Sequence, residues 1–123
     1  MDFTIEFIQM FFIALWYATP LIGLLVLVII ALGHIIGFRE RWSRTDSIYY
    51  AFITATTVGY GDFHPKKRLS KYLAIAISFV GIILTGIIVA LALHAASLAF
   101  KSNPDYKQLI EKIEQIEKVY ENN

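Results

Sequence analysis

The stretch TATTVGYGD, from Thr54 to Asp62, holds the residues of this chain whose types and spacing best suit a chemical role. It places threonines, two glycines and a carboxylate between two long apolar segments. These residues offer oxygen atoms and a backbone that is free to turn. The sequence has no nucleophile–base spacing, metal-ligand cluster or phosphate-binding loop, so an enzyme has no support. A glycine-containing loop that arose by chance is the alternative interpretation.

Part of this stretch, TVGYG, matches the sequence of potassium-channel selectivity filters. The match implies that Thr57, Val58, Gly59 and Tyr60 bind dehydrated K⁺ through their backbone carbonyls, with Gly61 ending the filter. Successive carbonyls can point the same way only if the backbone alternates in conformation, and the two glycines permit the positive φ that this requires. The Thr57 hydroxyl would add an oxygen at the inner end. One chain cannot surround an ion, but four chains around an axis can.

A short helix is expected directly before the filter, at about 44–56. Ser43 followed by Asp46 fits a capping box, with Thr45 as the alternative cap. Such a helix is too short to cross a bilayer, which takes about 20 residues. Irregular backbone at membrane depth is tolerated only where protein buries it or where it lines water. We therefore expect a re-entrant pore helix, whose negative dipole end would favour a cation in a central cavity.

Further residues are expected to support the filter. Asp62 follows it, adds negative charge at the outer mouth and needs a hydrogen-bond partner, which Tyr49 or Tyr50 can supply. The side chains of Val58 and Tyr60 are expected to point away from the pore and to brace the filter against the short helices.

Two long apolar segments flank this region, an outer helix at about 7–38 and an inner helix at about 69–100. The chain has 123 residues, of which 57% are hydrophobic, and a mean hydropathy of +0.58. Helices that are apolar all round need lipid or a large surrounding protein, so a multi-pass all-α membrane protein is favoured over a soluble helical hairpin. The net charge of +1 does not suggest a nucleic-acid partner.

Several residues of the first apolar segment have two interpretations. Pro20 either kinks the helix or separates an interfacial start from the true span. Trp16 and Tyr17 on one side and Trp42 on the other form two aromatic belts or pack against neighbouring helices.

The chain changes character after residue 100, so we predict a pore domain at 1–100 and a cytoplasmic tail helix at 101–123. Asn103 can cap this helix, with Pro104 at its first position. Apolar residues then recur at heptad spacing, which favours a parallel coiled coil that holds a tetramer. The alternative is a solvated amphipathic helix. The heptad residues are Tyr106, Leu109, Ile113, Ile116 and Tyr120.

With these motifs the chain resembles a prokaryotic two-transmembrane potassium channel over roughly residues 10–100, with TVGYGD complete from Thr57 to Asp62. The resemblance implies a passive, K⁺-selective homotetramer in the cell membrane, in contact with the lipid bilayer. It implies an extracellular filter mouth, a cytoplasmic tail and no cofactor besides the permeant K⁺. Ba²⁺ and quaternary ammonium ions are the pore blockers that it implies.

The resemblance also assigns roles to the inner helix. Gly81 lies where family members have a hinge glycine, and Gly86 lies where a small residue is common, which favours helix packing there. Close helix packing is the alternative role for Gly81. Thr85 either hydrates a cation or bonds back to its own helix. One helical stripe is expected to face the cavity and the inner gate, where Leu93 could close the mouth by dewetting. Its members are Ser78, Gly81 or Ile82, Thr85, Val89 and Leu93.

The sequence departs from the family pattern at several positions. Ile53 stands where several members carry an acidic residue that pairs with the filter aspartate, which puts their inactivation rules in doubt. His64 at the outer rim is a candidate for blocker or pH sensitivity. His94 is either a proton sensor or an interfacial anchor.

The charge distribution opposes the implied orientation. Seven of the eleven Lys and Arg lie in the segment that the resemblance makes extracellular, against the positive-inside rule. We give the filter motif more weight because the rule is statistical. These residues are Arg39, Arg41, Arg44, Lys66, Lys67, Arg68 and Lys71.

Three other functions stay open at this point. The chain could be a non-conducting or regulatory membrane subunit, or the isolated pore of a larger ligand-gated channel. A transporter-type K⁺ uptake subunit is disfavoured, because such proteins usually keep one filter glycine per repeat and carry four repeats in one chain.

Overall fold

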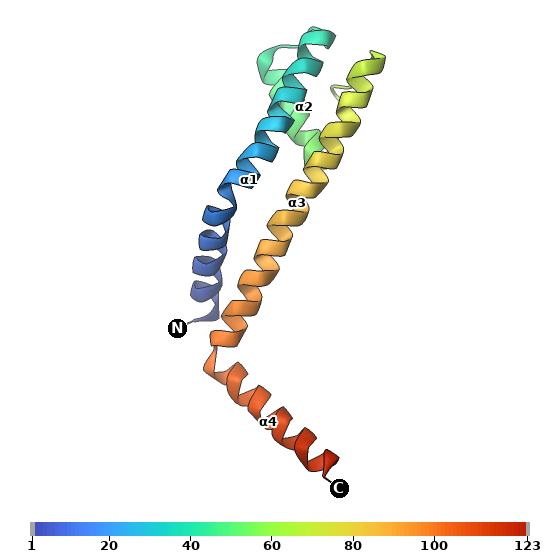
Figure 1. Ribbon diagram of the computed structural model, residues 1–123. Coiled ribbons are helices and arrows are strands. Elements are labelled where there is room, and N and C mark those ends of the chain that lie inside the picture. Colours follow the sequence, from blue (N-terminus) through green and yellow to red (C-terminus); the bar gives the residue numbers. More distant parts are fainter. Residues whose placement is uncertain (1, 123) are drawn as a thin grey trace. The chain divides into compact units, whose positions relative to one another are not determined.

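The structure, a computed structural model, describes residues 2–122. Within this range the chain forms four α-helices and no strand: α1 (Phe3–Glu40), α2 (Arg44–Ala55), α3 (Arg68–Ser102) and α4 (Pro104–Glu121) (Figure 1). By length and composition, α1 with 38 residues and α3 with 35 can cross a membrane. The expected all-α fold with two membrane-length helices is therefore confirmed, and both helices extend beyond their expected ends.

The described chain divides into two compact units. One is the continuous segment Ala18–Val89, and the other combines the residues up to Tyr17 with those from Ala90 onward. Helices α1 and α3 each contribute residues to both units.

In the segment Ala18–Val89, α2 packs against the later part of α1 and the first part of α3 (Figure 1). Fully buried Ile29 and Ile36 on α1 and Ile77 on α3 form the apolar core, together with Tyr50 on α2. On α2 the buried face otherwise carries small residues, which lets the helices approach closely. Those residues are Ser47, Ala51 and Ala55.

Helix α1 ends because Arg41 adopts a left-handed backbone with φ 62°. The backbone N–H of Trp42 then donates to the carbonyl oxygen of Gly37 at 2.8 Å, which satisfies a carbonyl of the last turn as in a Schellman motif. Glycine usually takes such a position, so the sequence did not predict this stop. Helix α1 is continuous through Pro20, so neither interpretation of Pro20 involves a break in the helix.

Helix α2 begins as the sequence predicts. The Ser43 hydroxyl accepts a hydrogen bond from the backbone N–H of Asp46 at 3.1 Å, so Ser43 is the cap and the alternative cap, Thr45, lies inside the helix. The Ser47 hydroxyl donates to the Ser43 carbonyl at 2.7 Å, which satisfies the buried hydroxyl locally.

The end of α1 and the start of α3 are joined by polar contacts. The backbone N–H of Lys67 donates to Glu40 Oε1 at 2.9 Å, and its ammonium group donates to the carbonyl oxygen of Arg39. These contacts fix the chain that follows the filter segment relative to α1.

In the other unit, aromatic rings join the first turn of α1 to the end of α3. The Phe3 and Phe100 ring centroids are 4.5 Å apart, and the Ser102 hydroxyl donates to the Glu6 carboxylate. The backbone N–H of Asp105 donates to the Asn103 side chain at 2.9 Å, which confirms the predicted cap of α4.

Candidate functional site

The TVGYG segment has an alternating backbone. The φ angles of Thr57, Gly59 and Gly61 are 66°, 53° and 81°, whereas Val58 and Tyr60 lie outside the positive-φ region. The positive φ predicted for the two glycines is confirmed. Every second residue is therefore left-handed, which is the arrangement that aiming successive carbonyls toward one axis requires.

Thr57 was not expected to be left-handed. Positive φ was predicted for the two glycines alone, because a β-branched residue with positive φ is rare and costs about 1–3 kcal/mol. Such strain persists only where the surrounding structure fixes the backbone. The only sequence signal for the left-handed backbone of Thr57 is its position two residues before Gly59, which continues the alternation of the glycines.

Hydrogen bonds attach this segment to the end of α2. The backbone N–H of Thr57 donates to the Thr54 carbonyl at 3.2 Å, and that of Gly59 donates to the Ile53 carbonyl at 3.1 Å. Carbonyl groups in the last turn of a helix lack partners within the helix, so the filter segment satisfies them. Ile53 thus contributes through its backbone, although its side chain cannot replace an acidic partner of Asp62.

Asp62 finds one of its two expected partners. The Asp62 carboxylate, which accepts a hydrogen bond from the Tyr49 hydroxyl, raises the pKa of Tyr49 above its usual 10.0. Asp62 Oδ1 also accepts from the backbone N–H of Phe63 at 3.1 Å. Tyr50 does not reach Asp62. It is buried in the core, where its hydroxyl forms a hydrogen bond with the side chain of Thr54.

An aromatic cluster beside Asp62 was missed in the sequence. The Phe63 ring meets Trp42 and Tyr49 edge-on, with centroid distances of 5.4 and 6.2 Å, and Trp42 also meets Tyr50 at 5.0 Å. Trp42 is therefore a packing residue, not only a membrane-interface ring. Trp16 and Tyr17, by contrast, are 77% and 81% exposed and stay candidates for an aromatic belt.

Among the described residues, no aromatic ring contact involves Tyr60, and Val58 and Tyr60 are 51% and 72% exposed. Much of their surface is therefore uncovered in a single chain. The predicted bracing of the filter would require contacts from a neighbouring copy.

The comparisons with known proteins bear on this segment directly. A family model described as "Ion channel" matches residues 21–97, which is more than half of the chain and includes α2, the TVGYG segment and most of α3. The chain belongs to the ion channel family. Membership confirms the interpretation as a channel and not an enzyme, and it makes the two apolar helices those of a membrane protein.

The similar proteins are named as potassium channels. "Two pore potassium channel b" of Oryza sativa subsp. japonica is 36% identical over 75 residues, covering 54% of this chain and 21% of its own. "Two-pore potassium channel 1" of Arabidopsis thaliana is 46% identical over 41 residues, covering 33% and 11%. "Probable potassium channel protein 2" of the archaeon Methanocaldococcus jannaschii is 33% identical over 57 residues, covering 46% and 17%.

These names confirm the resemblance to potassium channels, while the prokaryotic two-helix type stays a prediction. The chain spans about a fifth of the length of the rice relative and a smaller share of the length of the Arabidopsis and Methanocaldococcus relatives. No solved structure gave a significant match.

Two glycines on α3 of the channel differ sharply in their surroundings. A Cβ atom on Gly81 would overlap the Ala55 carbonyl oxygen and lie 2.5 Å from Ala55 Cα, whereas one on Gly86 would meet nothing within 4 Å. From the sequence we favour a hinge at Gly81 and packing at Gly86. Within one chain it is therefore Gly81, and not Gly86, where close helix packing leaves no room for a side chain. The hinge at Gly81 stays a prediction.

The predicted gate residues of the channel lie on the exposed part of α3. Thr85, Val89 and Leu93 are exposed, and Ile82 lies with them, whereas Gly81 is buried. Ser78 bonds back to the Ala74 carbonyl at 3.1 Å, but within the described residues the Thr85 hydroxyl has no such bond. Thr85 is therefore available to water or an ion.

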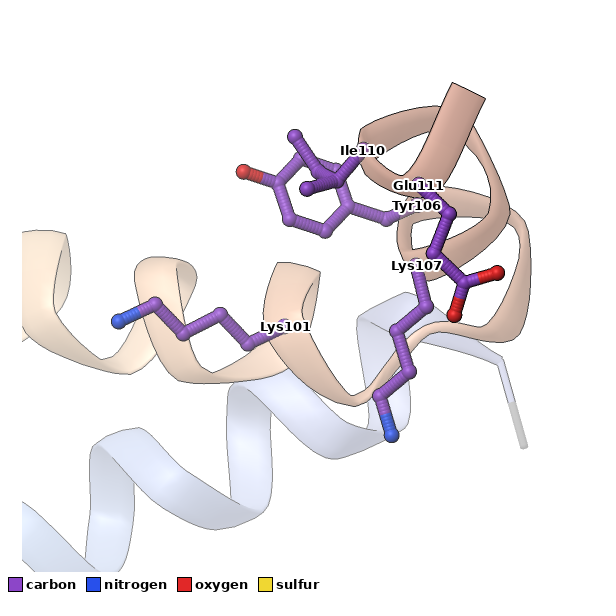
Figure 2. A pocket seen from close by; sticks show the side chains of 5 residues that line it. All are labelled: Lys101, Tyr106, Lys107, Ile110 and Glu111. Atoms are coloured by element: carbon purple, nitrogen blue, oxygen red, sulfur yellow. The ribbon is translucent and has the colours of Figure 1, made fainter. Parts of the chain in front are cut away.

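The tail of the channel has no buried residue among those described in α4. An open groove of about 370 Å³ lies at its start. Figure 2 shows Tyr106 and Ile110 together there, with Lys101 coming from the end of α3. Lys107 and Glu111 complete the lining. Four residues of the predicted seam are exposed: Leu109, Ile113, Ile116 and Tyr120.

Proposed function

We propose that four copies of this chain surround one K⁺-selective pore. The observation that carries the proposal is the left-handed backbone at every second residue of TVGYG, namely Thr57, Gly59 and Gly61. This alternation lets each copy present a column of carbonyl oxygens, and rings of such oxygens replace the hydration shell of K⁺. The names of the similar proteins support K⁺ as the permeant ion.

In this proposal the metal-binding residues are Thr57, Val58, Gly59 and Tyr60, which bind K⁺ by their backbone carbonyls, with Gly61 at the outer end. Asp62 and Tyr49 stabilise the outer mouth, and Tyr50 holds α2 in the core. The exposed side chains of Val58 and Tyr60 support an assembly, because neighbouring copies would cover them.

The inner helix and the tail complete the proposal. Leu93 narrows the inner mouth, and Thr85 hydrates ions in the cavity above it. The exposed apolar face of α4 pairs with its copies as a parallel bundle. We place the filter mouth outside the cell and the tail in the cytoplasm.

A flux assay on purified protein in liposomes tests this function. K⁺ efflux is measured with a matched Na⁺ gradient in parallel, before and after addition of Ba²⁺, and empty liposomes serve as the control. We expect K⁺ flux that Ba²⁺ stops, with little Na⁺ flux. Equal flux of both ions would contradict K⁺ selectivity. No flux from a verified tetramer would favour the non-conducting or regulatory subunit instead.

A further inference from the structure

Three glycines lie at points where α2 touches its neighbours. A Cβ atom on Gly33 of α1 would lie 2.5 Å from Ala51 Cβ. One on Gly37 of α1 would overlap Ser47 Oγ and lie 2.6 Å from Ser47 Cβ. On α3, one on Gly81 would overlap the Ala55 carbonyl oxygen, as described above. Real Cβ atoms do not approach other atoms this closely, so each glycine permits a contact that alanine would force apart.

The three partners lie on one face of α2. Ser47, Ala51 and Ala55 are spaced by four residues, which places them one above the other along the helix. All three are buried, with at most 3% of each exposed. Helix α1 contacts the first two and α3 contacts the last, so glycines on both long helices set the position of α2.

The position of α2 is passed on to the filter segment. Ala55 is the last residue of α2, and the Ile53 carbonyl in its last turn accepts the hydrogen bond from Gly59. A shift of α2 away from either long helix therefore moves the backbone of TVGYG. Packed interiors transmit such a shift because they have few voids to absorb it.

We propose that Gly33, Gly37 and Gly81 are positioning residues for ion selectivity, which act on the filter through α2. None of them touches the ion. The proposal rests on the proposed function, because it concerns selectivity in the pore that the filter forms.

The test compares K⁺ and Na⁺ flux for Gly33→Ala, for Gly33→Ala combined with Ala51→Gly, and for Gly23→Ala as a control. Gly23 is on the same helix, and a Cβ atom there meets nothing within 4 Å. We expect Gly33→Ala to lower the K⁺/Na⁺ flux ratio by about tenfold, equivalent to ~1.4 kcal/mol. The double variant removes the overlapping Ala51 Cβ and should restore the ratio after a small shift of the Ser47 carbonyl, 3.1 Å away.

Gly81→Ala gives a second, independent arm. Its closest neighbours are backbone atoms of Ala55, so Ala55→Gly removes none of them and should not restore selectivity. If Gly33→Ala does not assemble, the double variant carries the test: recovered assembly with wild-type selectivity supports the proposal, and failure to recover either one overturns it.

The outcomes separate this inference from the proposed function. A wild-type protein without K⁺-selective flux refutes the proposed function itself. A selective wild type with an equally selective Gly33→Ala refutes only the positioning role. A loss of selectivity in Gly23→Ala as large as that in Gly33→Ala would also overturn the proposal, because the effect would not depend on contact with α2.

Discussion

The backbone N–H of Gly59 donates a hydrogen bond to the carbonyl oxygen of Ile53 at 3.1 Å. This bond joins the centre of the TVGYG segment to the last turn of α2, so helix and filter segment form one structural element. The φ of 53° at Gly59 makes this bond possible.

Replacing Gly59 by alanine should therefore stop K⁺ flux. A side chain in a left-handed backbone costs about 1–2 kcal/mol, and the segment can relieve that cost by turning its carbonyls away from the axis. We expect K⁺ flux to fall by more than about tenfold in liposomes while the tetramer stays intact on native gels. Flux at the wild-type level would rule out the filter role of this residue.

The bond between Tyr49 and Asp62 should stabilise the conducting filter. Tyr49→Phe and Asp62→Asn should each shorten the time for which K⁺ flux is sustained, and the double variant should be no worse than the more affected single variant, because both changes remove one interaction. Tyr72→Phe, at an exposed position on α3, is the control. Additive effects would show that the two residues act separately.

The same bond gives a prediction for alkaline pH. The raised pKa of Tyr49 means that the protonated hydroxyl is favoured in the folded state, so its contribution to stability is full below pH 10.0 and is lost as the pH rises through the folded-state pKa. The difference in thermal stability between the wild type and Tyr49→Phe should be constant from neutral pH to about pH 9 and should shrink above pH 10. A difference that already disappears near neutral pH contradicts the assignment.

The tail should contribute to assembly through its apolar face. Charged residues in a bundle seam lose solvation, so Ile113→Asp with Ile116→Asp should raise the dissociation constant of the tetramer by more than about tenfold. Gln108→Asp with Gln115→Asp adds the same charges at solvent-facing heptad positions and should have little effect. Analytical ultracentrifugation in detergent compares the two. Equal stability of both variants would leave α4 as a solvated amphipathic helix.

Leu93 offers a test of the inner gate. Leu93→Asn should make a dewetted constriction easier to hydrate and raise K⁺ flux severalfold, whereas Leu93→Met keeps an apolar side chain of similar size and should not. K⁺ efflux rates of both variants against the wild type decide this. Unchanged flux in Leu93→Asn places the constriction elsewhere on α3.

Much of the fold could be predicted because it depends on local signals. Ser43 and Asn103 have side chains that commonly cap helices, and both do so here. The glycines of TVGYG take conformations that glycine adopts most easily. The two long apolar helices follow from composition and length.

The features that could not be predicted depend on contacts between elements that are distant in the sequence. Gly81 packs on Ala55 because α3 returns to the end of α2, and no pattern within α3 distinguishes it from Gly86. Thr57 and Arg41 have left-handed backbones that their residue types disfavour, so their conformations are imposed by neighbours. Tyr49 and Tyr50 are adjacent and chemically equal, and only the helix orientation decides which one reaches Asp62.

The exposure of Val58 and Tyr60 in a single chain has a consequence for biosynthesis. A newly inserted copy carries one strip of oxygen ligands and no closed ring, so on the proposed function it offers no leak for ions across the membrane. On the same proposal, the surfaces that are uncovered in the lone copy are those that further copies would cover. Assembly would then act as a safeguard, since on the proposed function permeability arises only in the complete complex and partially built complexes would leave the ion gradient intact.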